Sequence, residues 1–157
     1  MNTLVTALLW FGAIGCGVMA GAYFTFSAFV MKSLESIDTA AGISAMQSIN
    51  DVILKSAFMP LFFGTSLASA IAVVVYAMDP GASGGAWMAL AGGTYFVGMF
   101  LCTVFFNVPL NNKLKAVDPG SAEGAAVWQT YLHTWTRWNH VRTVASTIAC
   151  AFFIQAI

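Results

Sequence analysis

Long uncharged stretches alternate with short charged segments along the chain, and this pattern predicts membrane-spanning helices. No Asp, Glu, Lys or Arg precedes Lys32, and none lies between Lys55 and Asp79. A third uncharged stretch runs from Asp79 to Lys113, and a last apolar run reaches the C-terminus. An α-helix needs about 20 mostly apolar residues to cross a bilayer, so the first three stretches are each long enough for one span. The predicted spans are residues 4–30, 56–77, 86–108 and 138–157.

The fourth span is predicted to include polar residues. Only fifteen residues follow Arg142. At a rise of about 1.5 Å each they cover about 22 Å, whereas the hydrocarbon core is about 30 Å thick. The span must therefore begin near Trp138, which brings Asn139 and His140 as well as Arg142 to the membrane boundary or below it. Polar groups at that depth usually face the interior of a helix bundle or a wet cavity.

The first and third connections also have helical patterns. In the first, Asp38 or Thr39 can cap a helix whose apolar residues recur at helical spacing. That apolar face consists of Ile43, Met46, Ile49 and Ile53. In the third, turn residues at 118–121 precede a stretch without a helix breaker that begins at Ala122.

These elements predict a single all-α membrane domain over residues 1–157. Short turns make consecutive spans antiparallel, so the expected fold is an up-down-up-down four-helix bundle. A short amphipathic helix joins spans one and two, and the fourth helix is long. Gly17 and Gly21 form a small-xxx-small pattern that predicts close packing within the chain, with a homo-oligomer as the alternative.

Composition and charge support this interpretation. The chain is 59% hydrophobic and 8% charged, whereas soluble domains carry about 25% charged residues. A net charge of zero gives no sign of a nucleic-acid partner. All six Lys and Arg residues lie in or beside the first and third connections. The positive-inside rule therefore predicts both termini outside and these connections in the cytoplasm. We expect the membrane to be the inner membrane of a bacterium.

The N-terminal run and the cysteines suggest no further processing or chemistry. No basic residue precedes the first apolar run, so we expect an uncleaved span rather than a signal peptide. Cys16, Cys102 and Cys150 lie in apolar runs without C-x-x-C spacing, and we expect buried thiols.

Two polar clusters are predicted to meet at the cytoplasmic boundary. Residues 128–143 hold three of the five tryptophans, both histidines and both arginines. Helical spacing places six of these side chains on one face. They are Trp128, Tyr131, Trp135, Trp138, Asn139 and Arg142. The end of span three carries a second cluster, Asn107, Asn111 and Asn112, around Pro109. Antiparallel neighbours bring both clusters to one depth, which favours a pocket over an interfacial tryptophan belt with helix-ending asparagines.

The residues give little support for a metal or haem site. His133 and His140 are seven residues apart on one helix, about 10.5 Å, which is too far for one metal ion. No Glu-x-x-His pattern occurs, and the predicted spans contain no Asp or Glu.

The order of motifs resembles a known family. The pattern N-x-P-x-N-N, followed by W-x-x-Y-x-x-x-W-x-x-x-N-H-x-R, is similar to that of the small four-helix membrane proteins related to anthrone oxygenases. In this chain the first pattern covers 107–112 and the second 128–142. An F-x-F-S stretch with Phe24, Phe26 and Ser27 adds to the resemblance. The resemblance implies oxidation of an anthrone-type tricyclic phenol to a quinone by O₂, without metal or flavin.

The expected site follows from this chemistry. An anthrone can lose a proton to form an anion that reacts with O₂, so a base, oxyanion donors and a dry aromatic pocket are needed. We expect His140 as the base, with His133 as second choice. Arg142, Asn139 and Asn111 are expected to stabilise the oxyanion, and the expected substrate-binding residues are Trp135, Trp138, Tyr131, Asn107, Asn112 and His133.

Two other functions stay open at this point. The same pocket could serve a non-catalytic protein that binds or carries a quinone-like lipophilic molecule. Alternatively, the chain is a structural or partner-binding membrane subunit, with the tryptophan belt as its anchor. In each case the lipid bilayer is the expected surrounding medium.

Overall fold

The computed structural model describes residues 3–81 and 84–157, and within these ranges its regular structure is entirely helical. Several helices are continuous, because π-helical segments (η) join α-helical ones. The elements are α1 (Thr3–Thr25), η1 (Phe26–Val30), α2 (Met31–Glu35), α3 (Thr39–Ile53), α4 (Phe58–Met78), α5 (Gly85–Tyr95), η2 (Phe96–Leu101), η3 (Thr103–Asn107), α6 (Val108–Lys115) and α7 (Ala122–Ala156). The predicted all-α fold, with a short helix after the first span and a long last helix, is confirmed.

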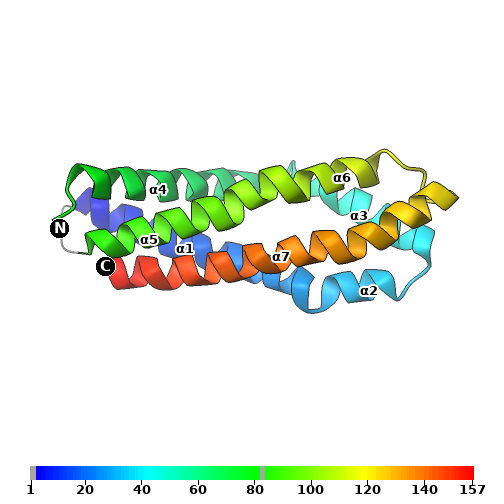
Figure 1. Cartoon of the computed structure of the whole chain (residues 1–157), viewed down its shortest axis with the longest axis horizontal. Helices are drawn as coiled ribbons and strands as arrows, with labels where there is room; N and C mark the ends of the chain where they lie inside the picture. The colour runs from blue at the N-terminus through cyan, green and yellow to red at the C-terminus, as the bar shows by residue number, and fades with distance from the viewer. Residues whose placement is uncertain (1–2, 82–83) are drawn as a thin grey trace.

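The three long apolar helices and the long last helix α7 lie lengthwise beside one another (Figure 1). The three apolar helices are Thr3–Glu35, Phe58–Met78 and Gly85–Lys115, and each is long enough to cross a membrane. The 35-residue α7 packs along α1 and α5. Consecutive long helices run in opposite directions, and both termini lie at one end of the molecule. That α7 also crosses the membrane stays a prediction, because its polar residues lower its hydropathy.

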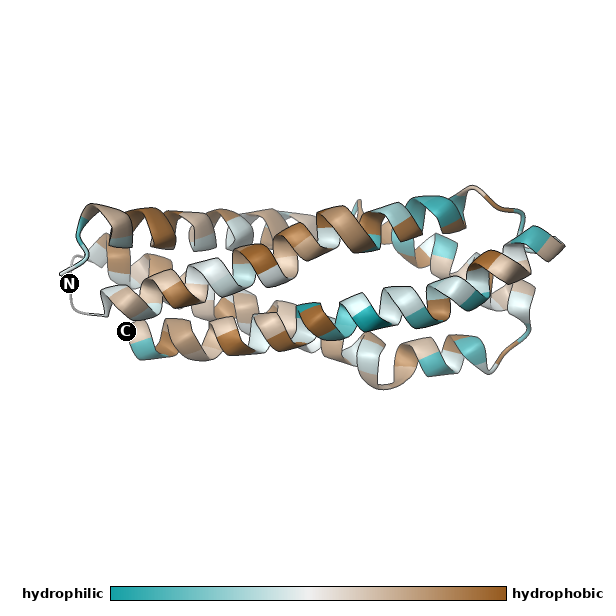
Figure 2. Ribbon diagram, viewed as in Figure 1, coloured by the Kyte–Doolittle hydropathy of each residue, from teal (hydrophilic) through white to brown (hydrophobic). Residues whose placement is uncertain are grey.

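Hydrophilic residues gather toward the end opposite the termini (Figure 2). They colour α6 and the middle of α7, whereas α4 and α5 are mostly apolar. This is the end that the distribution of Lys and Arg predicts to be cytoplasmic.

The short helix α3 forms part of a small second core at this end. Its Asp38 cap accepts a hydrogen bond from the Ala41 amide at 3.1 Å, as predicted. Ile43 and Met46 are fully buried among residues of the other helices, including Trp128. Gly42 permits this approach, because a Cβ there would lie 2.7 Å from the Leu34 carbonyl oxygen.

Close packing between the long helices depends on other glycines than expected. A Cβ at Gly92 in α5 would clash with the Ser69 carbonyl of α4, and one at Gly15 would clash with Thr65. A Cβ at Gly17 would make only an ordinary 3.6 Å contact with the Cys150 sulfur, and one at Gly21 would meet nothing within 4 Å. The predicted close approach at Gly17 and Gly21 within the chain is therefore wrong, since the small residues that neighbours press against lie on another face of α1.

Pro109 affects the helix that contains it. A proline has no backbone N–H and cannot complete the regular ladder of helix hydrogen bonds. The helix continues through Pro109, but the two segments before it, η2 and η3, are π-helical. Pro109 does not account for every π-helical segment, since η1 (Phe26–Val30) contains no proline; such segments are frequent at functional sites.

Candidate functional site

A cavity of about 450 Å³ lies between the helices near the more polar half of the molecule. Residues of α1, η1, α3, α4, η2, η3, α6 and α7 line it. Most of the wall is aromatic or aliphatic. Its aromatic members are Tyr23, Phe26, Phe58, Phe62, Phe63, Phe100 and Trp135. The polar members are few: Thr25, Asn50, Thr103, Asn111 and Arg142.

Among the described residues that line the cavity, Arg142 is the one Lys or Arg, and it is 5% exposed. Its guanidinium carbon lies 4.3 Å from the centre of the Tyr23 ring and 5.1 Å from that of Trp135. Nη2 donates to the Asn139 side-chain oxygen at 2.7 Å, and Nη1 donates to the Thr103 hydroxyl at 3.4 Å. No carboxylate pairs with Arg142 within the described ranges 3–81 and 84–157. Its Nε has no hydrogen-bond partner among these residues.

Asn139 lies behind Arg142 and fixes its position. The Asn139 side chain is fully buried, and its Nδ2 donates to the Tyr23 carbonyl and to the Ser27 hydroxyl, both at 2.7 Å. Its oxygen is thereby oriented toward the guanidinium of Arg142. Asn139 is thus a positioning residue that ties α7 to the junction of α1 and η1.

Trp135 forms one side of the cavity and leaves a donor unused. The indole is 5% exposed and stacks on the Tyr131 ring, with centres 5.5 Å apart and planes 17° apart. Its Nε1 is buried and finds no hydrogen-bond partner in the described part of the chain. A buried indole N–H usually has a partner. Together with Arg142 Nε it provides two unpaired donors on residues that line one cavity.

Asn111 and Tyr131 form a second polar point toward the α3 side. Tyr131 is 1% exposed, and its hydroxyl donates to the Asn111 side-chain oxygen at 2.8 Å. Tyr131 and Arg142 are eleven residues apart on α7, which corresponds to about 16 Å along a helix. The lining residues Asn111, which contacts Tyr131, and Arg142 therefore mark two separate polar points on the cavity wall.

Asn107 connects two helices and does not line the cavity. It is fully buried, and its Nδ2 donates to the Trp135 carbonyl at 3.2 Å, which joins η3 to α7. The predicted meeting of the asparagine cluster with the tryptophan-rich stretch does occur, but through Asn107 and Asn111 rather than Asn112, which is exposed.

Three other predicted site residues lie away from the cavity. The side chains of His133 and His140 are exposed, because positions 133 and 140 face away from the lining positions 135 and 142 on α7. His140 Nδ1 lies 2.9 Å from the Ser27 hydroxyl. Trp138 is half-buried and stacks on Phe106, with ring centres 3.8 Å apart and planes 9° apart.

Four lining residues with polar groups were not predicted from the sequence: Tyr23, Thr25, Asn50 and Thr103. The three with hydroxyl groups lie inside uncharged stretches, where a hydroxyl has no distinctive pattern. Asn50 could have been found, because it interrupts the apolar face of the predicted short helix between Met46 and Ile53. The Asn50 Nδ2 is buried and lacks a hydrogen-bond partner among the described residues.

The described residues contain no cluster of side chains suited to bind a metal ion. Among the described residues, no three His, Cys, Asp or Glu side chains gather in a way that could hold a metal ion. The two histidines point outward from α7, and the cysteines lie in apolar surroundings.

Comparison with known proteins identifies the family. A family model described as anthrone oxygenase matches residues 54–152, a segment that contains most of the lining residues, including Arg142. No curated protein and no solved structure shows significant similarity to the chain. Since the family match covers more than half of the sequence and agrees with the resemblance of the polar motifs, the chain belongs to the anthrone oxygenase family.

Proposed function

We propose that the protein is a membrane-embedded oxygenase that oxidises a lipophilic, anthrone-type aromatic with O₂ and needs no metal or organic cofactor. The observation that carries this proposal is Arg142, a buried guanidinium on an apolar aromatic cavity without a carboxylate partner in the described sequence. An arginine keeps its positive charge in proteins. Burying an ion without a counter-charge costs several kcal/mol, so such a residue at membrane depth is a marker of function.

The surroundings of Arg142 favour a flat ligand that carries an oxygen atom. The rings of Tyr23 and Trp135 lie within cation–π distance of the guanidinium, which offsets part of the desolvation cost. Cation–π contacts use no N–H group, so Arg142 Nε and the Trp135 indole N–H can still donate hydrogen bonds. A carbonyl or phenolate oxygen of a polycyclic aromatic can accept from such donors while its rings contact Phe58, Phe62 and Phe100.

The reaction balances without a cofactor. An anthrone methylene group, R₂CH₂, loses a proton to give an anion whose charge spreads onto the carbonyl oxygen. Electron transfer from this anion to O₂, followed by recombination, forms a C–O bond and gives the peroxide anion R₂CH–OO⁻. Protonation yields R₂CH–OOH, which loses water to give the ketone R₂C=O. Overall, R₂CH₂ and O₂ give R₂C=O and H₂O, and the substrate supplies all the electrons.

Arg142 assists the first step in this scheme. A guanidinium that faces the developing oxyanion stabilises the anion relative to the neutral substrate, and this effect is large where water is excluded. The lining within the described chain holds no imidazole or carboxylate. We therefore assign the deprotonation to the raised acidity of the substrate beside Arg142, with the proton passing to water outside the cavity. His140, expected from the sequence as the base, is assigned an indirect role through Ser27 and Asn139.

Oxygen uptake by purified protein in lipid nanodiscs tests the proposal. With anthrone as substrate, we expect the protein to accelerate formation of anthraquinone above the spontaneous rate, with one O₂ consumed for each quinone formed. Arg142→Met should remove most of this acceleration, since loss of one oxyanion donor typically costs about 10²- to 10³-fold. Arg142→Lys, which keeps the charge but changes its position, should retain an intermediate rate.

A matched control is Arg137→Met, because Arg137 is exposed on the same helix and does not line the cavity. Its turnover should equal that of the unmodified protein. Saturable quenching of tryptophan fluorescence by anthraquinone without accelerated oxidation would contradict an oxygenase and would favour the carrier function instead.

A further inference from the structure

The cavity has one exposed rim, and it is apolar. Four lining residues are exposed, all of them large and hydrophobic: Leu54 at 62%, Phe63 at 56%, Val104 at 42% and Val108 at 40%. We call these four the rim residues. Every polar residue of the lining is buried or half-buried.

The rim lies where two helices diverge. Leu54 ends α3 in the connection to α4, and Phe63 belongs to α4, whereas Val104 and Val108 belong to η3 and α6. α4 packs along α5 and reaches η2, but its packing against η3 and α6 is marginal at most. The opening therefore lies between α4 on one side and η3 with α6 on the other.

Both sides of the opening belong to helices that suit a membrane. Phe63 lies in Phe58–Met78, and Val104 and Val108 lie in Gly85–Lys115, which are two of the three helices apolar enough to span a bilayer. Exposed Phe and Val side chains are unfavourable in water, whereas hydrocarbon accepts them without cost. The composition of the rim thus fits contact with lipid acyl chains.

Another part of the cavity wall is formed by α3, whose C-terminal end adjoins the rim at Leu54. Met46, Ile49 and Ile53 of this helix cover the cavity. Gln47 Nε2 donates to the Leu114 carbonyl at 2.9 Å and to the Val117 carbonyl at 3.1 Å.

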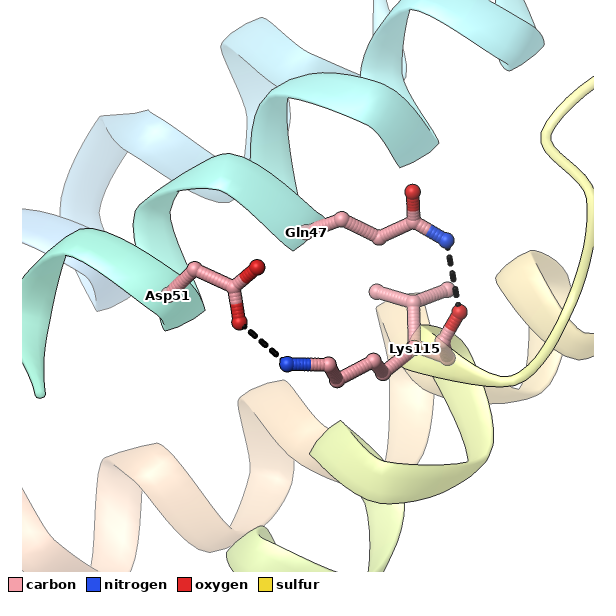
Figure 3. Close-up of polar contacts among 4 residues, drawn as sticks. Gln47, Asp51 and Lys115 are labelled. Atoms are coloured by element: carbon pink, nitrogen blue, oxygen red, sulfur yellow. Dashed lines mark hydrogen bonds and ion pairs between the residues drawn. The ribbon is translucent and has the colours of Figure 1, made fainter.

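An ion pair reinforces this cover. Lys115 Nζ and Asp51 Oδ1 are 2.6 Å apart, so α3 is tied to the end of α6 (Figure 3). The hydrogen bond from the Lys115 ammonium, together with its charge, lowers the pKa of the Asp51 carboxyl below its ordinary value. The carboxylate therefore stays ionised at neutral pH and maintains the pair.

From the rim and the cover together we infer that the ligand reaches the cavity sideways from the bilayer, between α4 and η3–α6, as a flat apolar aromatic dissolved in the lipid. This inference rests on the cavity as the binding site of the proposed function, but it does not depend on oxidation. The membrane itself is then the source of the ligand, and the rim residues form a lateral entry site.

Narrowing the rim tests this inference by the rate of binding. The double variant Val104→Phe with Val108→Phe adds bulk at one side of the opening and leaves the polar residues unchanged. Its matched control is Val74→Phe with Val97→Phe, two exposed valines of spanning helices that do not line the cavity. Protein in detergent–lipid micelles is mixed rapidly with micelles that carry anthraquinone, and tryptophan quenching is followed over time.

We expect the rim variant to bind about tenfold more slowly, because access becomes the slow step. Its final extent of quenching should be similar to that of the unmodified protein, which also shows that it is folded. The control should bind at the unmodified rate. A third variant, Gln47→Ala with Asp51→Asn, loosens the α3 cover and should leave the rate unchanged.

Three results would contradict lateral entry at the rim. One is an unchanged rate in the rim variant, and another is faster binding only when the α3 cover is loosened, which would indicate access from the aqueous side. The third is no saturable quenching of the unmodified protein, which would mean that the groove holds only lipid acyl chains. Slow binding in the rim variant without any anthrone oxidation would support lateral entry and contradict the proposed oxygenase activity.

Discussion

At the scale of single residues, the site depends on a buried charge and the side chains that hold it. Arg142 lies among aromatic rings, Asn139 fixes its Nη2, and Thr103 contacts its Nη1. The sequence indicated Arg142 and Asn139 correctly as internal, because the last span is too short without them. It could not indicate that α7 is rotated so that His140 faces outward, since one residue of rotation moves a side chain by about 100° around a helix.

The two neighbours Asn139 and His140 should therefore respond very differently to substitution. Asn139→Leu removes hydrogen bonds to Tyr23, Ser27 and Arg142, and it leaves buried groups unpaired. We expect it to lower the free energy of unfolding by about 1–3 kcal/mol and to abolish most turnover. His140→Ala, at an exposed position, should change stability by less than about 0.5 kcal/mol and retain most of the turnover.

Thermal unfolding in detergent and oxygen uptake measure both variants. If His140→Ala were inactive while its stability stayed unchanged, a direct role of this imidazole in proton transfer would be required after all.

At the scale of helices, packing is set by a few positions where only glycine fits. The sequence does not indicate which glycine packs against a neighbouring helix, because Gly92 and Gly93 are adjacent and identical in type. In the structure a Cβ at Gly92 meets the backbone of Ser69 in α4, whereas a Cβ at Gly93 meets nothing within 4 Å. The sequence did predict the helices themselves, because their length and apolar character are local properties, but the relative rotation of the helices depends on such contacts.

The adjacent glycines provide a matched pair of variants. Gly92→Ala should push α5 away from α4 and lower the free energy of unfolding by about 1–3 kcal/mol, the usual cost of overpacking. Gly93→Ala should leave stability unchanged or raise it slightly, because alanine favours the helix over glycine. Equal effects of the two substitutions in thermal unfolding would show that α4 and α5 do not pack closely at Gly92.

At the scale of the whole molecule, we predict that all four long helices cross the membrane. The positive charges predict an even number of spans, and both termini lie at one end of the molecule. Hydropathy alone finds three candidate spans, because α7 carries Arg137, Asn139, His140 and Arg142. The low hydropathy of α7 is compatible with a spanning helix, since Asn139 and Arg142 face the interior and lipid does not have to solvate them.

Tags at the two termini test the four-span arrangement. Both should react with a membrane-impermeant reagent applied outside intact cells, whereas a cysteine introduced at Lys113 should react only after the membrane is opened. A C-terminal tag that is protected while the N-terminal tag is accessible would show that α7 does not cross.

The most direct test of the central claim, that Arg142 stabilises an oxyanion in an apolar cavity, is the ionisation of a bound phenol. A hydroxyanthraquinone dye changes its absorption spectrum on losing its proton, so its pKa can be measured by titration in nanodiscs that hold the protein. We predict a pKa at least about one unit lower in the unmodified protein than in Arg142→Met, which corresponds to about 1.4 kcal/mol of preference for the anion. Equal dye pKa values in the two proteins, with binding intact in both, would contradict the claim.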